Sequence, residues 1–525
     1  MNLKFWKRSL PAAYSSSTPP KRRALTRSLL GLFKGGAGDK NNPSWTANLT
    51  TPDEFIRLRQ RALVARSREQ WSNNDYAKAF VRLMRQNVVG PNGTVMQAQA
   101  KKPRGGLDKD ANDALETAWC TWGEAENCDV AGKLTWRAIQ LLCIETAARD
   151  GEFFVRKVTG EDAGKWGFAL QVIDPQRCPV DYDVERYTTT TFIRHGIEFN
   201  RYGKPVAYHF GSTDETDRFY YSYSGRGYTR VPADEIIHGF VTEIAGQKRG
   251  LPWMSTGLFR LHHLGGFEDA AVQNARAGAS KMGFIQYKDG FGPECDDDTD
   301  VASTITAEPL SFHELPEGAE LAKFDPQFPS GETAVFVKHM LRGFSSGGGV
   351  PYNELANDLE GVNFSSIRQG TLDAREHYKE LQQWLIESLC AKVYAAWLPR
   401  ALLADLVTFK GRPLPPGRID AFQSVVWQPR RWAWIDPRAD VDASVESKNN
   451  FLTSASRIIR DQGLDPQTIW TEAARDIRAM IDALIAEGIP EDKATELVML
   501  TMGKEPQKPA PGNANEQNTA TAAAA

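Results

Sequence analysis

Residues 250–282 read GLPWMSTGLFRLHHLGGFEDAAVQNARAGASKM, and they are the most informative segment of the chain about its architecture. Pro252 suits the first turn of a helix, where its missing N–H is not needed, and a helical pattern continues to about Met282. At about 1.5 Å per residue such a helix is roughly 45 Å long, which exceeds most helices of globular proteins. The stretch therefore predicts one unusually long helix, with a break into two helices at Gly265-Gly266 as the alternative.

The predicted helix is also rich in small residues. Glycine inside a helix costs about 1 kcal/mol relative to alanine, so several glycines in one helix need a structural reason. Close approach of neighbouring backbones is such a reason. The small residues are Gly257, Gly265, Gly266, Ala270, Ala271, Ala275, Ala277, Gly278 and Ala279.

The chain before this helix changes its hydrophobic period near Gly151. Thr51-Pro52-Asp53-Glu54 is a capping box that opens a helical region. Helices are predicted over about 51–65, from about 72 past 84, and over 108–125 and 133–150. Strands are predicted over 152–158, 168–173, 197–199, 205–210 and 236–240, with a hairpin loop at 200–204. Residues 52–250 are therefore predicted to form an α+β unit.

The chain after the long helix holds a loop region and further helices. Residues 284–329 favour short strands and loops, and they contain an acidic run. A helix over about 330–345 is followed by Gly347-Gly348-Gly349, which predicts a break. Residues 365–397 are predicted to be helical again, and short helices are expected within 441–503.

Both ends of the chain have the composition of flexible segments. Residues 1–34 carry eight Lys or Arg and no acidic residue. Residues 1–50 are therefore predicted to be a flexible basic arm, which is either simply solvated or contacts nucleic acid or an acidic partner. Residues 504–525 are rich in Pro, Ala, Asn and Gln and are predicted to be disordered.

The composition of the whole chain limits the class of function. The 525 residues carry 63 Lys and Arg against 66 Asp and Glu, whereas domains that grip nucleic acid over their surface are usually clearly basic. No apolar run of about 18 residues and no secretory signal is found, so neither a spanning helix nor secretion is expected. Six scattered cysteines without a C-x-x-C pair favour reduced thiols in a cytosolic setting over a zinc site.

Catalytic motifs are nearly absent from the sequence. No Gly-Lys is followed by Ser or Thr, which excludes a P-loop, and no H-E-x-x-H motif occurs. Gly343-Phe344-Ser345-Ser346-Gly347 matches the nucleophile elbow G-x-S-x-G, but an elbow needs a strand before it and a helix after it. A helix is predicted before Ser345, so we expect no enzyme, no cofactor and no metal. A serine hydrolase that uses Ser345 stays as the alternative.

Short motifs spread in order over residues 55–440 carry a family resemblance. The motifs are Ala65-Arg66-Ser67-Arg68, Asn73 to Ala77, Asn87-Val88-Val89-Gly90, the hairpin from Phe199 to His209, His238, Gly246 to Trp253, Gly349-Val350-Pro351-Tyr352 and Asn363 to Arg368. Taken together, they resemble the portal proteins of tailed bacteriophages in the lambda-like branch. Phe364 departs from the pattern, because a tyrosine is more usual at that position in this branch.

The resemblance implies an α+β portal fold with an α/β wing, a long helical stem, a small clip with short strands and a helical crown. The first part of the wing would be 51–250 and the second part 365–440. The two stem helices would be 251–283 and 330–345, and the clip would lie between them at 284–329. A channel loop would occupy 346–364, and the crown would occupy 441–503.

The resemblance also implies a function and partners. Copies of the chain would form a ring, usually of twelve subunits, at one vertex of the capsid in the virion. Double-stranded DNA would pass through the ring during packaging and ejection. Its partners would be the terminase large subunit, the major capsid protein and scaffold, and later the head-completion and tail connector proteins. Assembly would take place in the host cytoplasm, with no membrane. A DNA-binding protein that uses the basic N-terminal arm is a second alternative.

Three groups of site residues follow from the resemblance. Arg249 is expected to be structural at the wing–stem junction, paired with an acid and away from DNA, together with Gly250, Pro252 and Trp253. The DNA-channel candidates are Asn353, Asn357, Asp358, Asn363 and Ser365, for which an ordinary surface loop is the alternative. The candidates for docking at the clip are Glu294, Asp296, Asp297, Asp298 and Asp300.

Overall fold

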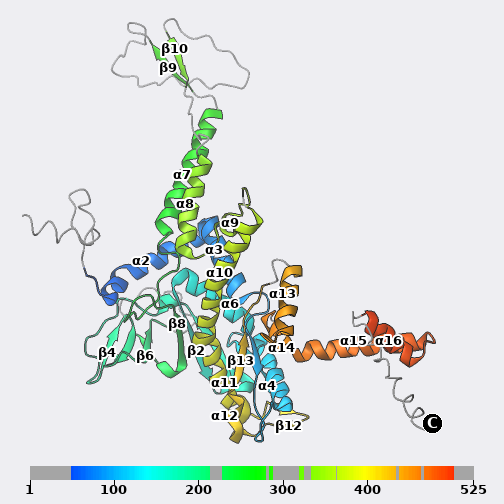
Figure 1. Cartoon of the computed structure of the whole chain (residues 1–525). Helices are drawn as coiled ribbons and strands as arrows, with labels where there is room; N and C mark the ends of the chain where they lie inside the picture. Colours follow the sequence, from blue (N-terminus) through cyan, green and yellow to red (C-terminus); the bar gives the residue numbers. More distant parts are fainter. Residues whose placement is uncertain are drawn as a thin grey trace, which may run out of the picture.

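The computed structural model describes residues 49–212, 227–279, 283–287, 319–323, 333–361, 363–432, 437–462 and 466–501. Figure 1 shows a body of helices and sheets, from which a pair of helices projects on one side and a helical arm extends on another. The fold is a mixture of helices and antiparallel sheets, which confirms the α+β prediction at that level. Within the described residues, no helix combines the length and the hydropathy needed to cross a membrane.

Helices make up the first part of the body. The backbone N–H of Glu54 donates to the hydroxyl of Thr51 at 3.3 Å, so the first helix begins at the predicted cap. It continues to Asn73, beyond the predicted end near residue 65, and Asn74 then caps the next helix. The helices are α2 (Pro52–Asn73), α3 (Asp75–Met84), the π-helical turn η2 (Arg85–Val89), α4 (Lys109–Trp122), α5 (Ala125–Cys128) and α6 (Trp136–Asp150).

Two antiparallel sheets follow α6. In the first, the strand order is β3-β2-β8, and Phe154 of the central strand lies opposite both Ile173 and His238. In the second, the order is β4-β5-β6-β7, and the predicted hairpin joins β5 to β6. The strands are β2 (Glu152–Thr159), β3 (Phe168–Ile173), β8 (Ile236–Phe240), β4 (Thr191–Arg194), β5 (Ile197–Asn200), β6 (Pro205–Phe210) and β7 (Thr229–Pro232).

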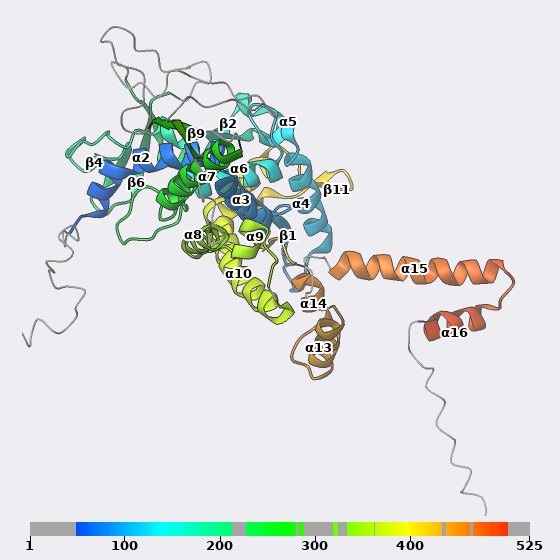
Figure 2. The same ribbon diagram turned by 90° about the horizontal axis from the view of Figure 1, so that it is seen from above.

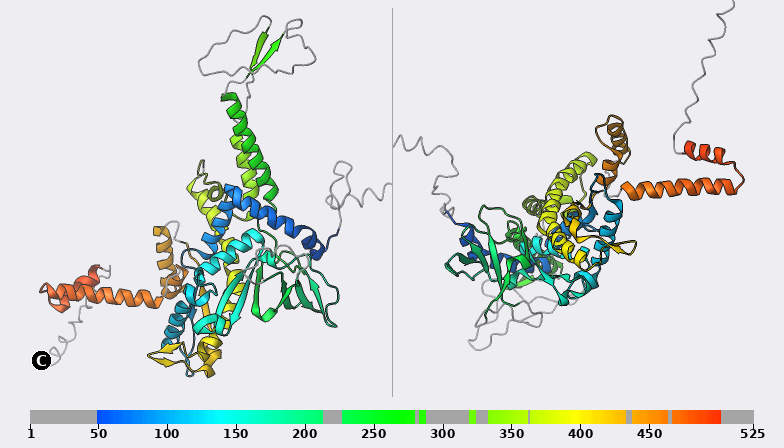
Figure 3. Two further views of the ribbon diagram at one scale, coloured as in Figure 1. Left: turned by 180° about the vertical axis from the view of Figure 1, so that it is seen from behind. Right: turned by 90° about the horizontal axis from the view of Figure 1, so that it is seen from below.

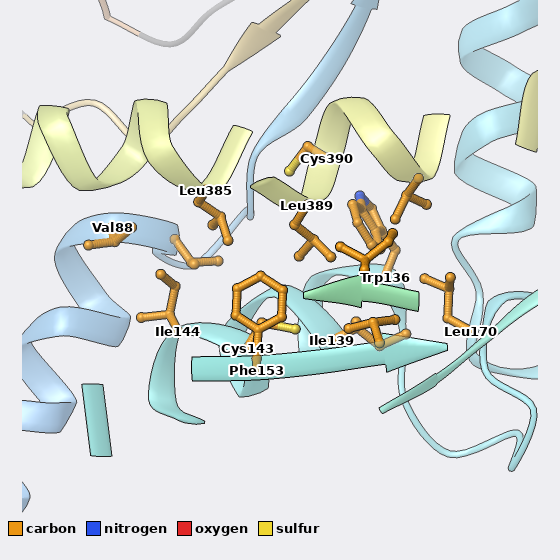
Figure 4. Packing of buried hydrophobic residues seen from close by; sticks show 14 of the residues in the cluster. Val88, Trp136, Ile139, Cys143, Ile144, Phe153, Leu170, Leu385, Leu389 and Cys390 are labelled. Carbon is orange, nitrogen blue, oxygen red and sulfur yellow. The ribbon is translucent and has the colours of Figure 1, made fainter. Parts of the chain in front are cut away.

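A large hydrophobic core joins segments from both halves of the chain. Trp119 of α4 lies edge-on to Trp136 at 5.6 Å and to Trp397 at 5.1 Å, measured between ring centroids. Figure 4 shows Phe153 of β2 facing Leu389 across the same core. The later segments therefore complete a body that begins at α2. They are α10 (Phe364–Leu385), η6 (Ile386–Cys390), α11 (Ala391–Leu403), β11 (Thr408–Phe409), β12 (Arg412–Pro413), α12 (Ile419–Phe422) and β13 (Val425–Gln428), which pairs with β1 (Val95–Ala98).

Helices α7 (Leu258–Ala279) and α8 (Thr333–Gly348) form the projecting pair (Figure 1). The predicted start of the long helix at Pro252 was wrong, because residues 253–257 form turns and Met254 packs into the core. The alternative break at Gly265-Gly266 does not occur, since α7 runs through both glycines. A methyl group on Gly257 would lie 2.1 Å from the ring of Phe344, so this glycine lets the two helices approach closely at their base.

The remaining elements lie at the two extremities of the molecule. Strands β9 (Gly283–Tyr287) and β10 (Ala319–Lys323) pair antiparallel beyond the tip of α7. The short α9 (Tyr352–Ala356) follows α8. Helices α13 (Pro437–Asn449), α14 (Ala455–Asp461), α15 (Pro466–Ala486) and α16 (Glu491–Thr501) lead away from the body, and Figure 3 shows α15 and α16 folded back on each other at the end of this arm.

Candidate functional site

Arg249 is completely buried where the chain leading to α7 passes the start of β2. Its Nη2 lies 2.6 Å from Oε1 of Glu152, and neither side chain is accessible to solvent. Its Nη1 donates to the carbonyl oxygens of His195 at 2.7 Å and of Cys178 at 3.2 Å. A buried charge is tolerated only when it is paired and hydrogen-bonded, and both conditions hold here. The acid that the sequence analysis expected beside Arg249 is therefore Glu152.

Glu152 is the centre of a buried polar network. It accepts hydrogen bonds from Nε2 of Gln60 at 3.1 Å, from the backbone N–H of Gly250 at 2.9 Å and from Nε2 of His238 at 3.0 Å. Burial alone would raise the pKa of Glu152, but Arg249 and His238 outweigh it and lower the pKa to about 2. Burial lowers the pKa of His238, so its ring stays neutral and donates to the carboxylate. The network ties α2, β2 and β8 to the chain that enters α7.

Gly250, Pro252 and Trp253 lie beside the end of α6. A methyl group on Gly250 would lie 2.1 Å from the carbonyl oxygen of Gly151, so only glycine allows the two backbones to come this close. The backbone N–H of Trp253 donates to the carbonyl of Ala148 at 3.1 Å. The structure thus places the predicted junction residues together, at the base of α7.

The segment 346–364 is partly helical. Helix α8 continues through Gly347 and ends at Gly348, so the predicted break falls within the glycine run but not at its first residue. A methyl group on Gly347 would lie 2.8 Å from the hydroxyl of Thr256, and one on Gly348 would lie 2.8 Å from the ring of Phe80. The absence of a side chain at both glycines therefore allows α8 to pack closely against its neighbours. Only Gly349, with φ of +66°, turns the chain toward α9.

Most of the polar candidates in this segment have local structural roles. Asn357 has φ of +52° and ends α9, and the carbonyl of Asn353 accepts the backbone N–H of Asp358 at 3.2 Å. Asn363 caps α10, because its side chain accepts the backbone N–H of Ser365 at 2.8 Å. Asn357, Asn363 and Ser365 are exposed, so their remaining polar atoms face solvent.

Asp358 links the projecting pair to this segment. Its Oδ2 accepts from Nζ of Lys338 on α8 at 2.8 Å and from the hydroxyl of Tyr352 at 2.8 Å. These two hydrogen bonds lower the pKa of Asp358 to about 2, and the same carboxylate contributes to raising the pKa of Tyr352, after burial, to about 12. The polar edge of 346–364 is thus fixed to α8 by an ion pair.

Ser345 lies inside α8 and is buried. Its hydroxyl donates to the carbonyl oxygen of Val350 at 2.5 Å. A nucleophile elbow requires a serine exposed at a turn between a strand and a helix, which is not the geometry of this residue. The hydrolase alternative therefore has no support at Ser345.

The proposed docking acids between Glu294 and Asp300 lie outside the described residues, as do the basic arm up to residue 48 and the tail from residue 502. Glu152 as the partner of Arg249, and Gln60 as a donor to Glu152, were not predicted from the sequence. A signal existed for Glu152, because it is an acid directly before the apolar run Phe153-Phe154-Val155. The cavity lined by arginines from distant segments was not predicted either, because no local pattern exists for it.

Comparison with known proteins gives consistent sequence matches. The family described as phage portal protein, lambda family, matches residues 38–382. The probable portal protein of Halomonas phage phiHAP-1 is 34% identical over 480 residues, which cover 90% of this chain and 91% of that protein. The portal protein of Escherichia phage N15 is 21% identical, over 87% of this chain and 92% of its own. Portal protein B of Escherichia phage lambda is 20% identical, over 87% of this chain and 91% of its own.

Solved structures give a weaker likeness. A chain from the neck of the empty GTA particle, computed with C6 symmetry, matches with a TM-score of 0.41 and 15% identity, covering 77% of this chain and 94% of that chain. The sequence matches, by contrast, extend over most of the chain and bear the same description in each case. This chain therefore belongs to the lambda family of phage portal proteins.

Proposed function

We propose that this chain is the portal subunit, or head-tail connector, of a tailed phage, and that its copies assemble into a ring of twelve. The observation that carries the proposal is the lambda-family match over residues 38–382, with 34% identity to a phage portal protein along 90% of the chain. The ring occupies one vertex of the capsid, and double-stranded DNA passes through its channel in both directions. The chain has a structural role and not an enzymatic one.

In this proposal the projecting pair α7–α8 is the stem. The small residues of α7 support it, because no heavy atom lies within 4 Å of a methyl group placed on Gly265 or Gly266. These positions leave room for a neighbouring helix to approach, as a ring of stems requires. The region of β9 and β10 is the clip, α13 to α16 belong to the crown, and the body is the wing.

The polar edge of 346–364 faces the channel in this arrangement, at the point where α8 turns into α9. Asn353, Asn357, Asp358, Asn363 and Ser365 line it. The near-neutral charge of the whole chain, 63 basic against 66 acidic residues, supports a conduit. Each phosphate contact adds affinity, so a channel with many of them would hold DNA rather than let it pass.

The other partners follow from the same role. The acidic residues at 294–300 form the surface on which the terminase large subunit docks during packaging, and the head-completion and tail connector proteins replace it afterwards. The wing contacts the major capsid protein and scaffold. Assembly takes place in the host cytoplasm, before the ring is enclosed in the virion.

Native mass measurement and negative-stain images of the purified chain test the proposal. Rings with a fixed subunit number are expected, and a stable monomer at high concentration would refute the proposal. Gly266→Leu should abolish rings while the chain keeps its circular dichroism spectrum, because the added side chain fills the space left for the neighbouring stem. Gly417→Leu is the matched control, since Gly417 also has open space around it and lies two residues before α12, which is at the opposite end of the body from α7 (Figure 1).

A further inference from the structure

A cavity of about 830 Å³ lies among the end of α3, η2, the first turns of α6, the middle of α10 and Arg430 and Trp432, which follow β13. Helix α9 closes one side of it through Glu354. Figure 2 shows α3, α9 and α10 around this part of the molecule. The cavity is within the size range of pockets that hold small ligands. We call it the arginine pocket, because its lining includes Arg82, Arg85, Arg137, Arg375 and Arg430.

The charges in the arginine pocket do not balance. Five guanidinium groups line the pocket, and three carboxylates lie near them. These are Glu354 in the lining, Glu145, whose Oε2 lies 2.9 Å from Arg85, and Asp440, which interacts electrostatically with Arg375. A formal surplus of two positive charges remains. Burial lowers the pKa of Arg430 and the neighbouring Arg375 lowers it further, whereas Glu354 raises it, so the two guanidinium groups share the Glu354 carboxylate. Such an arrangement is unfavourable unless an anion joins it.

Aromatic stacking and hydrogen bonds hold two of these arginines in place. The guanidinium carbons of Arg375 and Arg430 lie 5.5 Å and 5.9 Å from the ring centroid of Trp432. Arg430 also donates to the carbonyl of Gln86 and, at 2.9 Å, to Oδ1 of Asn87. The indole N–H of Trp432 donates to the same Asn87 oxygen at 3.0 Å. Preorganised cations of this kind bind an anion at a lower entropic cost than mobile surface side chains.

Two further arginines extend the positive surface at the rim. Arg82 on α3 and Arg137 at the start of α6 are exposed, and neither forms an ion pair within the part of the chain that the structure describes. Gly90 lines the pocket and lies directly against the side chain of Arg430. A methyl group there would lie 2.6 Å from Cδ of Arg430, and its φ of +72° favours glycine.

We infer that the arginine pocket is a binding site for a phosphate group. Guanidinium groups that converge from several elements suit a tetrahedral anion with several oxygens, since each planar fork can donate two parallel hydrogen bonds. The phosphodiester backbone of DNA and free phosphate share this chemistry. The assignment of DNA as the ligand rests on the proposed portal function. The assignment of a phosphate group does not rest on it, because all five arginines come from one chain and the pocket is complete without a ring.

The test compares the full-length chain with Arg82→Gln/Arg137→Gln. Arg57→Gln/Arg59→Gln is the matched control, because these two arginines are exposed on α2, outside the pocket. Fluorescence anisotropy with a labelled double-stranded DNA, between about 50 and 200 mM NaCl, measures DNA binding. Thermal melting with added inorganic phosphate measures binding of the free anion. Negative-stain images record whether each variant forms rings.

DNA binding about tenfold weaker in the pocket variant, with a salt slope smaller by about one per arginine, supports the site with DNA as its ligand. Unchanged DNA binding, together with stabilisation by phosphate that the pocket variant alone loses, supports the site with free phosphate as its ligand. The inference is overturned if both variants behave equally in both measurements. It is also overturned if polyglutamate competes with the labelled DNA for the full-length chain while inorganic phosphate has no effect. Failure to form rings would count against the portal function and leave these outcomes unchanged.

Discussion

Arg249 and the arginine pocket use the same side chain under opposite conditions. Arg249 is inaccessible to solvent, and Glu152 and the carbonyl oxygens of its own chain surround its guanidinium. The pocket holds five arginines against three nearby acids. A buried charge needs its partners within the fold, whereas a partly exposed cluster can leave charge for a ligand. The comparison teaches that the local balance of acids, and not the residue type, separates a structural arginine from a binding one.

Removal of one partner of the buried pair should have the largest effect on stability. Arg249→Ala leaves the Glu152 carboxylate buried without its cation, and Glu152→Ala leaves the guanidinium without its anion. Each change should lower the free energy of unfolding by about 3–5 kcal/mol, because an uncompensated charge then stays in the interior. The midpoint of urea denaturation, followed by circular dichroism, measures the loss.

Two controls belong to this experiment. The double variant Arg249→Met/Glu152→Leu removes both charges and should be less destabilised than either single variant, since no unpaired charge is left. Arg57→Ala removes an exposed arginine and should change the free energy of unfolding by no more than about 0.5 kcal/mol. Single variants at the buried pair that matched Arg57→Ala would show that the pair does not stabilise the junction.

Replacement by alanine should change the stability in opposite directions at Gly250, before α7, and at Gly265, within α7. At Gly250 a methyl group would lie 2.1 Å from a backbone oxygen, so Gly250→Ala should cost about 1–3 kcal/mol through overpacking. At Gly265 the space is open, and Gly265→Ala should raise the stability of the unassembled chain by up to about 1 kcal/mol through helix propensity. Thermal melting of both variants under the same conditions tests the pair. A loss at Gly265 comparable to that at Gly250 would disprove the assigned difference in packing.

The buried network also predicts a dependence on pH. Burial lowers the pKa of His238 in the folded state from its ordinary value of 6.5, so below about pH 6.5 the unfolded chain binds a proton that the folded chain does not. The free energy of unfolding should therefore decrease as the pH is lowered through this range, by at most about 1.4 kcal/mol per pH unit for His238. Glu152, whose folded pKa is lowered to about 2 from 4.5, loses its contribution only as the pH falls from 4.5 toward 2.

The measurement is the melting temperature between about pH 7 and pH 5. Burial also lowers the pKa values of His195 and His209, so the difference between variants matters and not the absolute slope. His238→Gln should show a shallower fall than the wild type. His262→Gln, at an exposed position on α7, should keep the wild-type slope. Equal slopes for the wild type and His238→Gln would argue against a neutral histidine in the network.

Local signals predicted the fold better than they predicted the site. The cap at Thr51, the hairpin between β5 and β6 and the end of α6 at Gly151, with φ of +95°, follow from residues next to each other in sequence. The start of α7 depends on packing of Met254 into the core, so residue patterns misplaced it. The exact end of α8 within the glycine run depends on contacts with distant side chains. Helix propensity disfavours glycine, but the contact with Phe80 requires a small residue there.

The site was less predictable because its contacts join distant parts of the chain. Arg249 and Glu152 are 97 positions apart, so the sequence could indicate an acid as partner but not which one. The hydrogen bond from Arg430 to Gln86 crosses 344 positions. The imbalance of charge in the arginine pocket appears only when these segments come together. The near-neutral total of the chain carries no information on such a local surplus.

The smallest expected effect concerns Asn357, and it separates backbone conformation from side-chain contact in the segment 346–364. With φ of +52°, Asn357→Gly keeps the turn after α9 and should change the free energy of unfolding by no more than about 0.5 kcal/mol. The yield of DNA-filled capsids should also stay at the wild-type level, because a conduit needs no specific grip at this residue. Asn357→Ala should cost about 1–2 kcal/mol, since alanine disfavours the left-handed conformation. A lower capsid yield for the glycine variant, with melting unchanged, would instead assign the amide side chain a direct contact with DNA. The side chain of Asn357 would then be a ligand-binding group, as proposed for the pocket arginines, and not a structural one such as Arg249.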